Sequence, residues 1–122
     1  MSATVLIVED NALVLEVYRS CLSPLGLGLL VARSGEEALR LLATETPQLA
    51  VLDIYLPGVS GYQVLAAMRA HTRLKHIPAI AVTNAATPEE RQKLAHAGFQ
   101  AVLPKPVAVA EFVSTVRRIL QR

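Results

Sequence analysis

The sequence predicts an α/β fold in which a parallel β-sheet lies between two layers of helices. Short apolar runs alternate five times with longer segments of helical spacing, as in parallel sheets with helical crossovers. The runs TVLIV and LAVLD are apolar almost throughout, as expected of strands that are covered on both faces. No linker, internal repeat or low-complexity tract interrupts the alternation, so we expect one domain over residues 1–122.

Five strands are predicted from the short apolar runs. In chain order they are 4–8, 29–32, 49–53, 77–83 and 101–104. The second run is the weakest, and we expect it near an edge of the sheet. Pro78 must lie near the start of the fourth strand, where a missing N–H is tolerated. Because crossovers between parallel strands are right-handed, few topologies remain.

Five helices are predicted from apolar spacing and capping residues. Their approximate ranges are 12–25, 35–43, 61–70, 88–97 and 109–120. Thr87, Pro88 and Glu90 give the fourth helix a strong start, with a threonine cap and a capping box. The residues predicted to face the core from the first helix are Leu13, Val17, Cys21 and Leu25. Those predicted to do so from the last helix are Val109, Phe112, Val113, Val116, Ile119 and Leu120.

Composition and charge exclude several classes of protein. Hydrophobic residues make up 52% of the 122 residues and charged residues 18%, which is a globular balance. The apolar runs fall far short of the roughly 20 residues of a membrane-spanning helix, and no signal peptide is recognisable. The cations behind the net charge of +2 are dispersed, which does not favour a nucleic-acid surface. With Cys21 as the single cysteine, we expect a cytoplasmic protein without disulfides.

Polar residues follow four of the five predicted strands, at the point where each strand ends. They are Glu9 and Asp10 after the first, Asp53 after the third, Thr83 after the fourth and Lys105 after the fifth. Any one of them would be unremarkable as a turn or cap residue. Because the carboxyl ends of parallel strands share one edge of the sheet, we expect all of them to converge in one cleft.

This set of side chains favours phosphoryl chemistry with a divalent cation. Three crowded carboxylates resist ionising together, and an oxygen-only site with open positions suits Mg²⁺, or the similar Mn²⁺. A carboxylate beside the cation can attack phosphorus and form an aspartyl phosphate. Thr83 can donate a hydrogen bond to a phosphoryl oxygen, and Lys105 can offset the charge on another.

Five segments carry a resemblance to a known family. They are VLIVEDN, SGEEAL, LDIYLPGVSGYQVL, IPAIAVTNAA and LPKP. At these spacings the whole chain closely resembles the receiver domains of bacterial two-component response regulators, of the single-domain, chemotaxis-regulator type. The resemblance implies a flavodoxin-like (βα)5 three-layer sandwich with strand order 2-1-3-4-5. The chain ends about two residues after the last predicted helix, so no output domain is expected.

The resemblance also implies a role for each carboxylate. By position, Asp53 is the phosphoacceptor, and Glu9 and Asp10 are the acidic pair that holds Mg²⁺ together with it. Tyr55, two residues past the phosphoacceptor, would offer its backbone carbonyl to the cation.

Three further positions match the family. Thr83 is the switch hydroxyl, Lys105 is the phosphate-binding lysine, and the peptide bond before Pro106 is expected to be cis.

Three positions depart from the family pattern. Val102 stands where an aromatic switch residue is usual, so a swinging ring coupled to Thr83 is not expected. Asn84, directly after Thr83, stands where the family usually has a small residue. Tyr55 is bulky at a position that modulates access to the phosphoryl group, and we hypothesise that it partly covers Asp53 and slows hydrolysis of the phosphate.

The implied function is signalling rather than turnover of a separate substrate. A histidine on a sensor histidine kinase or a histidine phosphotransfer protein would donate the phosphoryl group to Asp53. Phosphorylation would then switch the binding of a downstream target to the face formed by 87–98, 101–104 and 109–120. Direct contacts with nucleic acid or membrane are not expected.

Several alternatives share parts of this pattern. A flavodoxin-type electron carrier needs a phosphate loop after the first strand, where two carboxylates would repel phosphate. A dehalogenase-type phosphatase needs an aspartate at the position of Tyr55. A receiver-fold adaptor that is never phosphorylated stays open because of Val102, and so does a receiver fragment of a hybrid histidine kinase.

Overall fold

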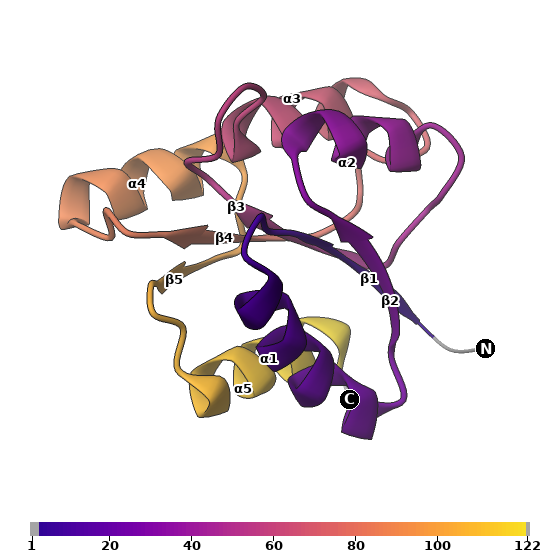
Figure 1. The fold of residues 1–122 in the computed structure, drawn as a ribbon. Coiled ribbons are helices and arrows are strands. Elements are labelled where there is room, and N and C mark those ends of the chain that lie inside the picture. Colours follow the sequence, from indigo (N-terminus) through magenta and orange to yellow (C-terminus); the bar gives the residue numbers. More distant parts are fainter. Residues whose placement is uncertain (1–2, 122) are drawn as a thin grey trace.

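The computed structural model describes residues 3–121 and contains one five-stranded sheet between two helical layers (Figure 1). The strands are β1 (Thr4–Val8), β2 (Gly28–Ala32), β3 (Leu49–Asp53), β4 (Ala79–Thr83) and β5 (Ala101–Pro104). Their order is β2-β1-β3-β4-β5, and every neighbouring pair is parallel. The predicted fold class and strand order are therefore confirmed, with β2 at one edge.

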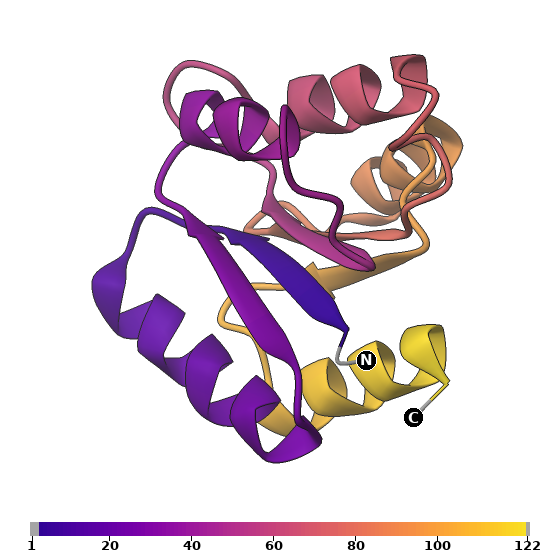
Figure 2. The same ribbon diagram turned by 90° about the vertical axis from the view of Figure 1, so that its right-hand side faces the viewer.

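The helices cover the sheet unequally. They are α1 (Ala12–Leu22), the short 3-10 helix η1 (Ser23–Leu25), α2 (Gly35–Leu42), α3 (Gly61–Ala70), α4 (Pro88–Ala97) and α5 (Val109–Leu120). Helices α1 and α5 lie on one face, and α2, α3 and α4 lie on the other (Figures 1 and 2). Among residues 3–121, no helix combines the length and apolar character needed to cross a membrane.

The two faces of the sheet bury separate apolar clusters. Successive side chains of a strand point to opposite faces. Leu6 and Leu52 accordingly pack under α2, α3 and α4, while Ile7 and Val51 pack under α1 and α5. Because both faces of the sheet are buried, the sequences of the central strands are continuous apolar runs. It also leaves the ends of the strands as the places where polar side chains can gather.

Side-chain caps fix where α1 and α4 begin, as the sequence predicts. The Asn11 side chain accepts hydrogen bonds from the backbone N–H groups of Leu13 and Val14, and Thr87 accepts one from Glu90. Gly98 ends α4 in the left-handed conformation, with φ of 113°. These caps place the starts of α1 and α4 close to the carboxyl ends of β1 and β4.

The predicted inward face of the first helix is wrong at Leu13 and Val17, whereas Cys21 and Leu25 are half-buried against the core. Leu13 is 79% exposed and Val17 is 47% exposed. The buried residues are Leu15, Tyr18 and Leu22, whose spacings of three and four follow the helical period more closely than a repeat of four. The Tyr18 ring packs against Phe112 of α5, with ring centroids 4.8 Å apart. This aromatic contact sets the rotation of α1.

Most of the predicted inward face of α5 is buried or half-buried. Phe112 and Val116 are buried, and Val113, Ile119 and Leu120 are half-buried. Val109 is the exception: it lies in the first turn of the helix and is 53% exposed. The prediction is wrong at this residue, which lines a cavity between α1 and α5.

Gly61, the first residue of α3, lies directly against the end of β3. A Cβ atom at Gly61 would lie 2.7 Å from the carbonyl oxygen of Asp53 and 2.9 Å from Cα of Ile54. Both neighbours are backbone atoms, so a side chain at Gly61 would push on the segment that carries Asp53.

Gly61→Ala should therefore lower the free energy of unfolding by about 1–3 kcal/mol, as overpacking in a tight interior does. Urea denaturation followed by circular dichroism measures the difference. Gly28→Ala is the matched control, because its new Cβ would make ordinary contacts, the nearest at 3.4 Å to Oγ1 of Thr4. Equal effects of the two substitutions would contradict this account of Gly61.

Candidate functional site

The predicted polar residues meet at the carboxyl edge of the sheet. Glu9 directly follows β1, Asp53 and Thr83 are the last residues of β3 and β4, and Lys105 directly follows β5. Glu9, Asp53 and Thr83 are buried, although each lies at the end of a strand rather than within the apolar core. Asp10 is exposed beside them. Parallel pairing brings these residues together although they are up to 96 positions apart in the chain (105 − 9).

Three carboxylates form a compact acidic cluster. One oxygen each from Glu9, Asp10 and Asp53 lies within 4.8 Å of the others. Carboxylates this close repel one another when ionised, so the arrangement requires nearby positive charge.

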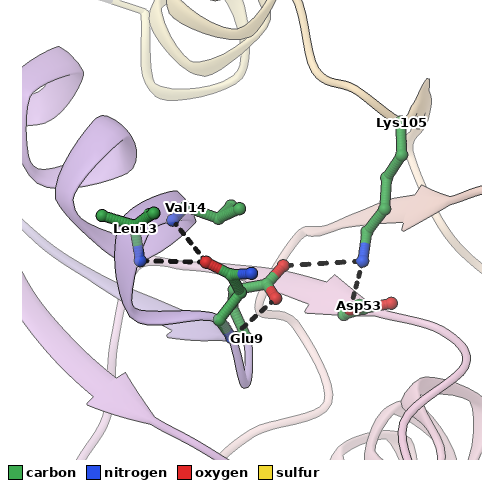
Figure 3. A network of polar contacts seen from close by, with 6 residues as sticks. Glu9, Leu13, Val14, Asp53 and Lys105 are labelled. Atoms are coloured by element: carbon green, nitrogen blue, oxygen red, sulfur yellow. Dashed lines mark hydrogen bonds and ion pairs between the residues drawn. The ribbon is translucent and has the colours of Figure 1, made fainter.

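Lys105 supplies part of that charge. Its Nζ lies 2.5 Å from Oδ2 of Asp53 and 3.6 Å from Oε1 of Glu9, and Figure 3 shows the ammonium between the two carboxylates. Burial alone would lower the pKa of Lys105, but the hydrogen bond and charge of Asp53 and the charge of Glu9 outweigh it and raise the pKa. The lysine therefore carries a proton at neutral pH.

The backbone of Lys105 is held as well as its side chain. Its N–H donates to the carbonyl of Thr83 at 2.9 Å, which continues the pairing of β4 with β5 by one residue. The Lys105–Pro106 peptide bond is cis. The hydrogen bond to Thr83 fixes the point from which the side chain extends across β4 toward Asp53.

The surroundings of the Glu9 carboxylate suit a role as a ligand of a cation. Its Oε2 accepts a hydrogen bond from the N–H of Asn11 at 3.0 Å. Its Oε1 is buried and has no hydrogen-bond donor among residues 3–121. Burial is the main reason that the pKa of Glu9 is raised. A buried carboxylate oxygen whose ion-pair partner Lys105 stands 3.6 Å away, beside two other carboxylates, suits a hard divalent cation such as Mg²⁺.

Thr83 presents a fixed hydroxyl at the end of β4. The residue is fully buried, and its Oγ1 accepts a hydrogen bond from the N–H of Ala85 at 3.0 Å. Because the oxygen accepts from the backbone, the hydroxyl proton remains available for an acceptor placed in the cleft.

Tyr55 has a side-chain partner that the sequence does not indicate. The residue is 55% exposed, and its hydroxyl donates to Oε1 of Glu90 at 2.6 Å. Tyr62 donates to the same oxygen at 3.1 Å. Sequence reasoning assigns Glu90 only a capping role, because no spacing rule connects residues 35 positions apart on different elements.

Val102 lies under α4 without an aromatic ring. Its side chain is half-buried against the apolar cluster on the face covered by α2, α3 and α4. Its carbonyl accepts a hydrogen bond from Nη1 of Arg91 at 3.3 Å, and Nε of Arg91 donates to the carbonyl of Ala86 at 3.2 Å. Arg91 therefore ties α4 to β5 and to the loop that precedes the helix.

A cavity of about 510 Å³ opens beside Lys105 between α1 and α5. Its polar end includes Glu9, Asp10 and Asn84, and its remaining lining is largely apolar. Val17 and Val109, the exposed residues whose burial was predicted, line it.

Comparison with known proteins agrees with this geometry. Residues 5–117 match the response regulator receiver domain family. The polar-differentiation response regulator DivK of Brucella ovis is 37% identical over 120 residues, which is 98% of each chain.

Solved structures of receiver domains have the same fold. The receiver domain of a signal transduction histidine kinase from Syntrophus aciditrophicus is 28% identical, with a TM-score of 0.88 over 98% of this chain and 91% of that one. The receiver domain of the sensor histidine kinase PA1611 from Pseudomonas aeruginosa is 27% identical, with a TM-score of 0.87 over the whole of both chains. Its structure contains a magnesium ion coordinated in the active-site cleft. The chain described here therefore belongs to the receiver domain family of two-component response regulators.

Proposed function

We propose that this receiver domain takes a phosphoryl group onto Asp53 and thereby switches the binding of a partner protein. The observation that carries the proposal is the environment of Asp53: a buried carboxylate, 4% exposed, paired with Lys105 inside a three-carboxylate cluster. A carboxylate buried for structural reasons alone needs no second and third carboxylate beside it, because each one adds repulsion.

The proposed reaction is a transfer between two side chains. The phosphorus–nitrogen bond of a phosphohistidine on a donor protein breaks, and a phosphorus–oxygen bond to Asp53 forms. The histidine ring leaves with the electron pair of the broken bond. Later attack by water returns Asp53 and inorganic phosphate. The protein is then a switch and not an enzyme that turns over a separate substrate.

The residues present fit a bound divalent cation, and Mg²⁺ is the one we propose. Glu9, Asp10 and Asp53 would hold it, with the backbone carbonyl of Tyr55 as a further oxygen ligand. When bound, the cation supplies positive charge to the oxygens of the transferring group. The magnesium ion in the related PA1611 receiver domain supports this assignment.

Lys105 and Thr83 would stabilise the charge that develops during transfer. The ammonium already lies 2.5 Å from Asp53, so it is placed to neutralise a phosphoryl oxygen on that carboxylate. The buried hydroxyl of Thr83 would donate to another. The Thr83 hydroxyl is held by the N–H of Ala85 and the Lys105 ammonium by its ion pair with Asp53, so both are in place before the reaction.

Two surfaces suit the proposed partners. The cavity between α1 and α5 opens directly at the acidic cluster and has exposed Val17 and Val109 on its lining, which suits an apolar part of the phosphoryl donor. A sensor histidine kinase or a histidine phosphotransfer protein is the donor that fits. The face formed by α4, β5 and α5 is proposed to bind the downstream target.

Asp53→Ala should abolish phosphorylation. Incubation of the wild-type protein with acetyl phosphate and Mg²⁺, followed by intact mass spectrometry, should show the gain of one phosphoryl group. Glu16→Ala, which removes an exposed carboxylate from α1, should leave the gain unchanged. Absence of any gain in the wild-type protein would favour the alternative of an adaptor that is never phosphorylated.

Asp10→Asn should weaken Mg²⁺ binding by about tenfold or more, because it removes a charged ligand. Relief of repulsion should also raise the melting temperature of the metal-free protein. Melting curves with and without millimolar Mg²⁺ measure both effects, because a ligand that binds only the folded state raises the melting temperature. An unchanged response to Mg²⁺ in the variant would remove Asp10 from the site.

Tyr55→Asn should shorten the lifetime of the aspartyl phosphate, because the smaller side chain admits water to Asp53. A rate constant for loss of phosphate roughly threefold higher or more is expected, which corresponds to about 0.6 kcal/mol in the barrier. The decay of the phosphorylated mass after removal of acetyl phosphate gives the rate. An unchanged or slower loss would show that Tyr55 does not shield Asp53.

A further inference from the structure

One carboxylate oxygen joins three elements on the α4 side of the site. Oε1 of Glu90, in the first turn of α4, accepts hydrogen bonds from the hydroxyl of Tyr55 at 2.6 Å and the hydroxyl of Tyr62 at 3.1 Å. Tyr55 lies in the loop after β3, two residues past Asp53, and Tyr62 lies in α3. We call this set of three residues the Glu90 clamp.

We propose that Glu90 is a positioning residue that holds the Tyr55 ring beside Asp53 and so lengthens the lifetime of the aspartyl phosphate. The proposal rests on phosphorylation of Asp53, and it assigns control of the lifetime to a residue of α4. Glu90 acts through Tyr55 and does not itself touch the reacting atoms.

Glu90 is a firmly placed acceptor. Its backbone N–H donates to Oγ1 of Thr87 at 3.2 Å, which fixes the first turn of α4. The neighbouring Arg91 side chain donates to the carbonyls of Ala86 and Val102. The start of α4 is thus tied both to the loop before it and to β5, so the carboxylate starts from a fixed backbone.

Tyr62 keeps the carboxylate in place from the other side. Its ring packs edge-on against Phe99, with centroids 6.3 Å apart, and Nζ of Lys93 lies 5.4 Å from its centre. Burial and the hydrogen bond to Glu90 raise the pKa of Tyr62 to about 12, so the hydroxyl stays protonated and donates. Two donors on one oxygen restrict the rotation of the Glu90 side chain.

Tyr55, by contrast, depends on the clamp for its position. More than half of its surface is exposed, and exposed side chains change rotamer within picoseconds to nanoseconds unless something holds them. The hydrogen bond to Glu90 directs the ring from the end of β3 toward α4. Tyr55 follows Asp53 by two residues in the chain, so the clamp holds its ring on the loop that continues from the phosphoacceptor.

The geometry is tested first without phosphorylation. The chain contains three tyrosines, so ¹³C-labelled tyrosine rings give a spectrum that can be assigned residue by residue. Glu90→Ala should shift the ring signals of Tyr55 and Tyr62. The ring signals of Tyr18 should stay unchanged, because Tyr18 packs against Phe112 on the other face of the sheet. An unchanged Tyr55 signal would overturn the proposal.

The second experiment measures the half-life of the phosphate after removal of acetyl phosphate. Glu90→Ala should shorten the half-life by about three- to tenfold, the range for losing a partly exposed hydrogen bond to a charged acceptor. Glu90→Gln keeps an acceptor oxygen and should stay close to the wild type. Glu89→Ala removes the adjacent exposed carboxylate of the same helical turn and should change nothing.

A double substitution separates positioning from a general effect on α4. Tyr55→Phe removes only the hydroxyl and should shorten the half-life as Glu90→Ala does. In the Tyr55→Phe background, Glu90→Ala should add little further effect, because residues that act through one contact are not additive. Fully additive effects would overturn the proposal.

The outcomes distinguish this proposal from the proposed function. If the wild-type protein gains no phosphoryl group, phosphorylation of Asp53 is refuted and the role of Glu90 in its lifetime is refuted with it. A second outcome is that the wild-type protein gains the phosphoryl group, Tyr55→Asn shortens its lifetime and Glu90→Ala does not. Phosphorylation of Asp53 and its shielding by Tyr55 would then be supported, and the role of Glu90 would be refuted.

Discussion

The ion pair between Lys105 and Asp53 is the interaction on which the arrangement of the carboxyl edge depends. A carboxylate that is 4% exposed is costly without compensation, and removal of one partner from a buried pair leaves an uncompensated charge. Lys105 stabilises two such groups, because it also lies 3.6 Å from Glu9. Its backbone is bound to the end of β4, so one residue connects the ends of β1, β3, β4 and β5. The apolar strands beneath can end in buried acids because this ammonium reaches them.

Much of the fold and most of the candidate site follow from the sequence. The alternation of apolar runs and helical spacing gives the parallel sheet, and parallel strands bring their carboxyl ends to one edge. Glu9, Asp53, Thr83 and Lys105 meet there for that reason alone. What the sequence does not give is the rotation of α1, because two apolar stripes compete on that helix. The contact of Tyr18 with Phe112, between residues 94 positions apart (112 − 18), decides between them.

The Glu90 clamp lies beyond sequence reasoning for a related reason. The residues around Thr87 and Glu90 predict a cap and a capping box. The structure confirms the Thr87 cap, but the Glu90 side chain accepts from Tyr55 and Tyr62 and does not close the box. The carboxylate, however, still has free lone pairs, and which hydroxyl groups reach them depends on how α3 and α4 pack. With valine at position 102, polar contacts tie α4 to its surroundings in addition to the buried Leu94: Glu90 accepts from two tyrosines, and Arg91 donates to two backbone carbonyls. Hydrogen bonds of this kind depend on direction, whereas an aromatic ring at position 102 would be held mainly by the shape of the cavity around it.

The register of the sheet restricts how this protein can change over evolutionary time. In β3, Leu52 is paired with both Val8 and Ala81, and Asp53 is paired with Val82. Since side chains alternate between faces, inserting or deleting one residue in 49–53 would exchange the two buried clusters and move Asp53 out of reach of Lys105. Substitutions among aliphatic residues preserve both arrangements. We therefore expect descendants of this sequence to vary in length only in the loops, while the number of residues in each central strand stays constant.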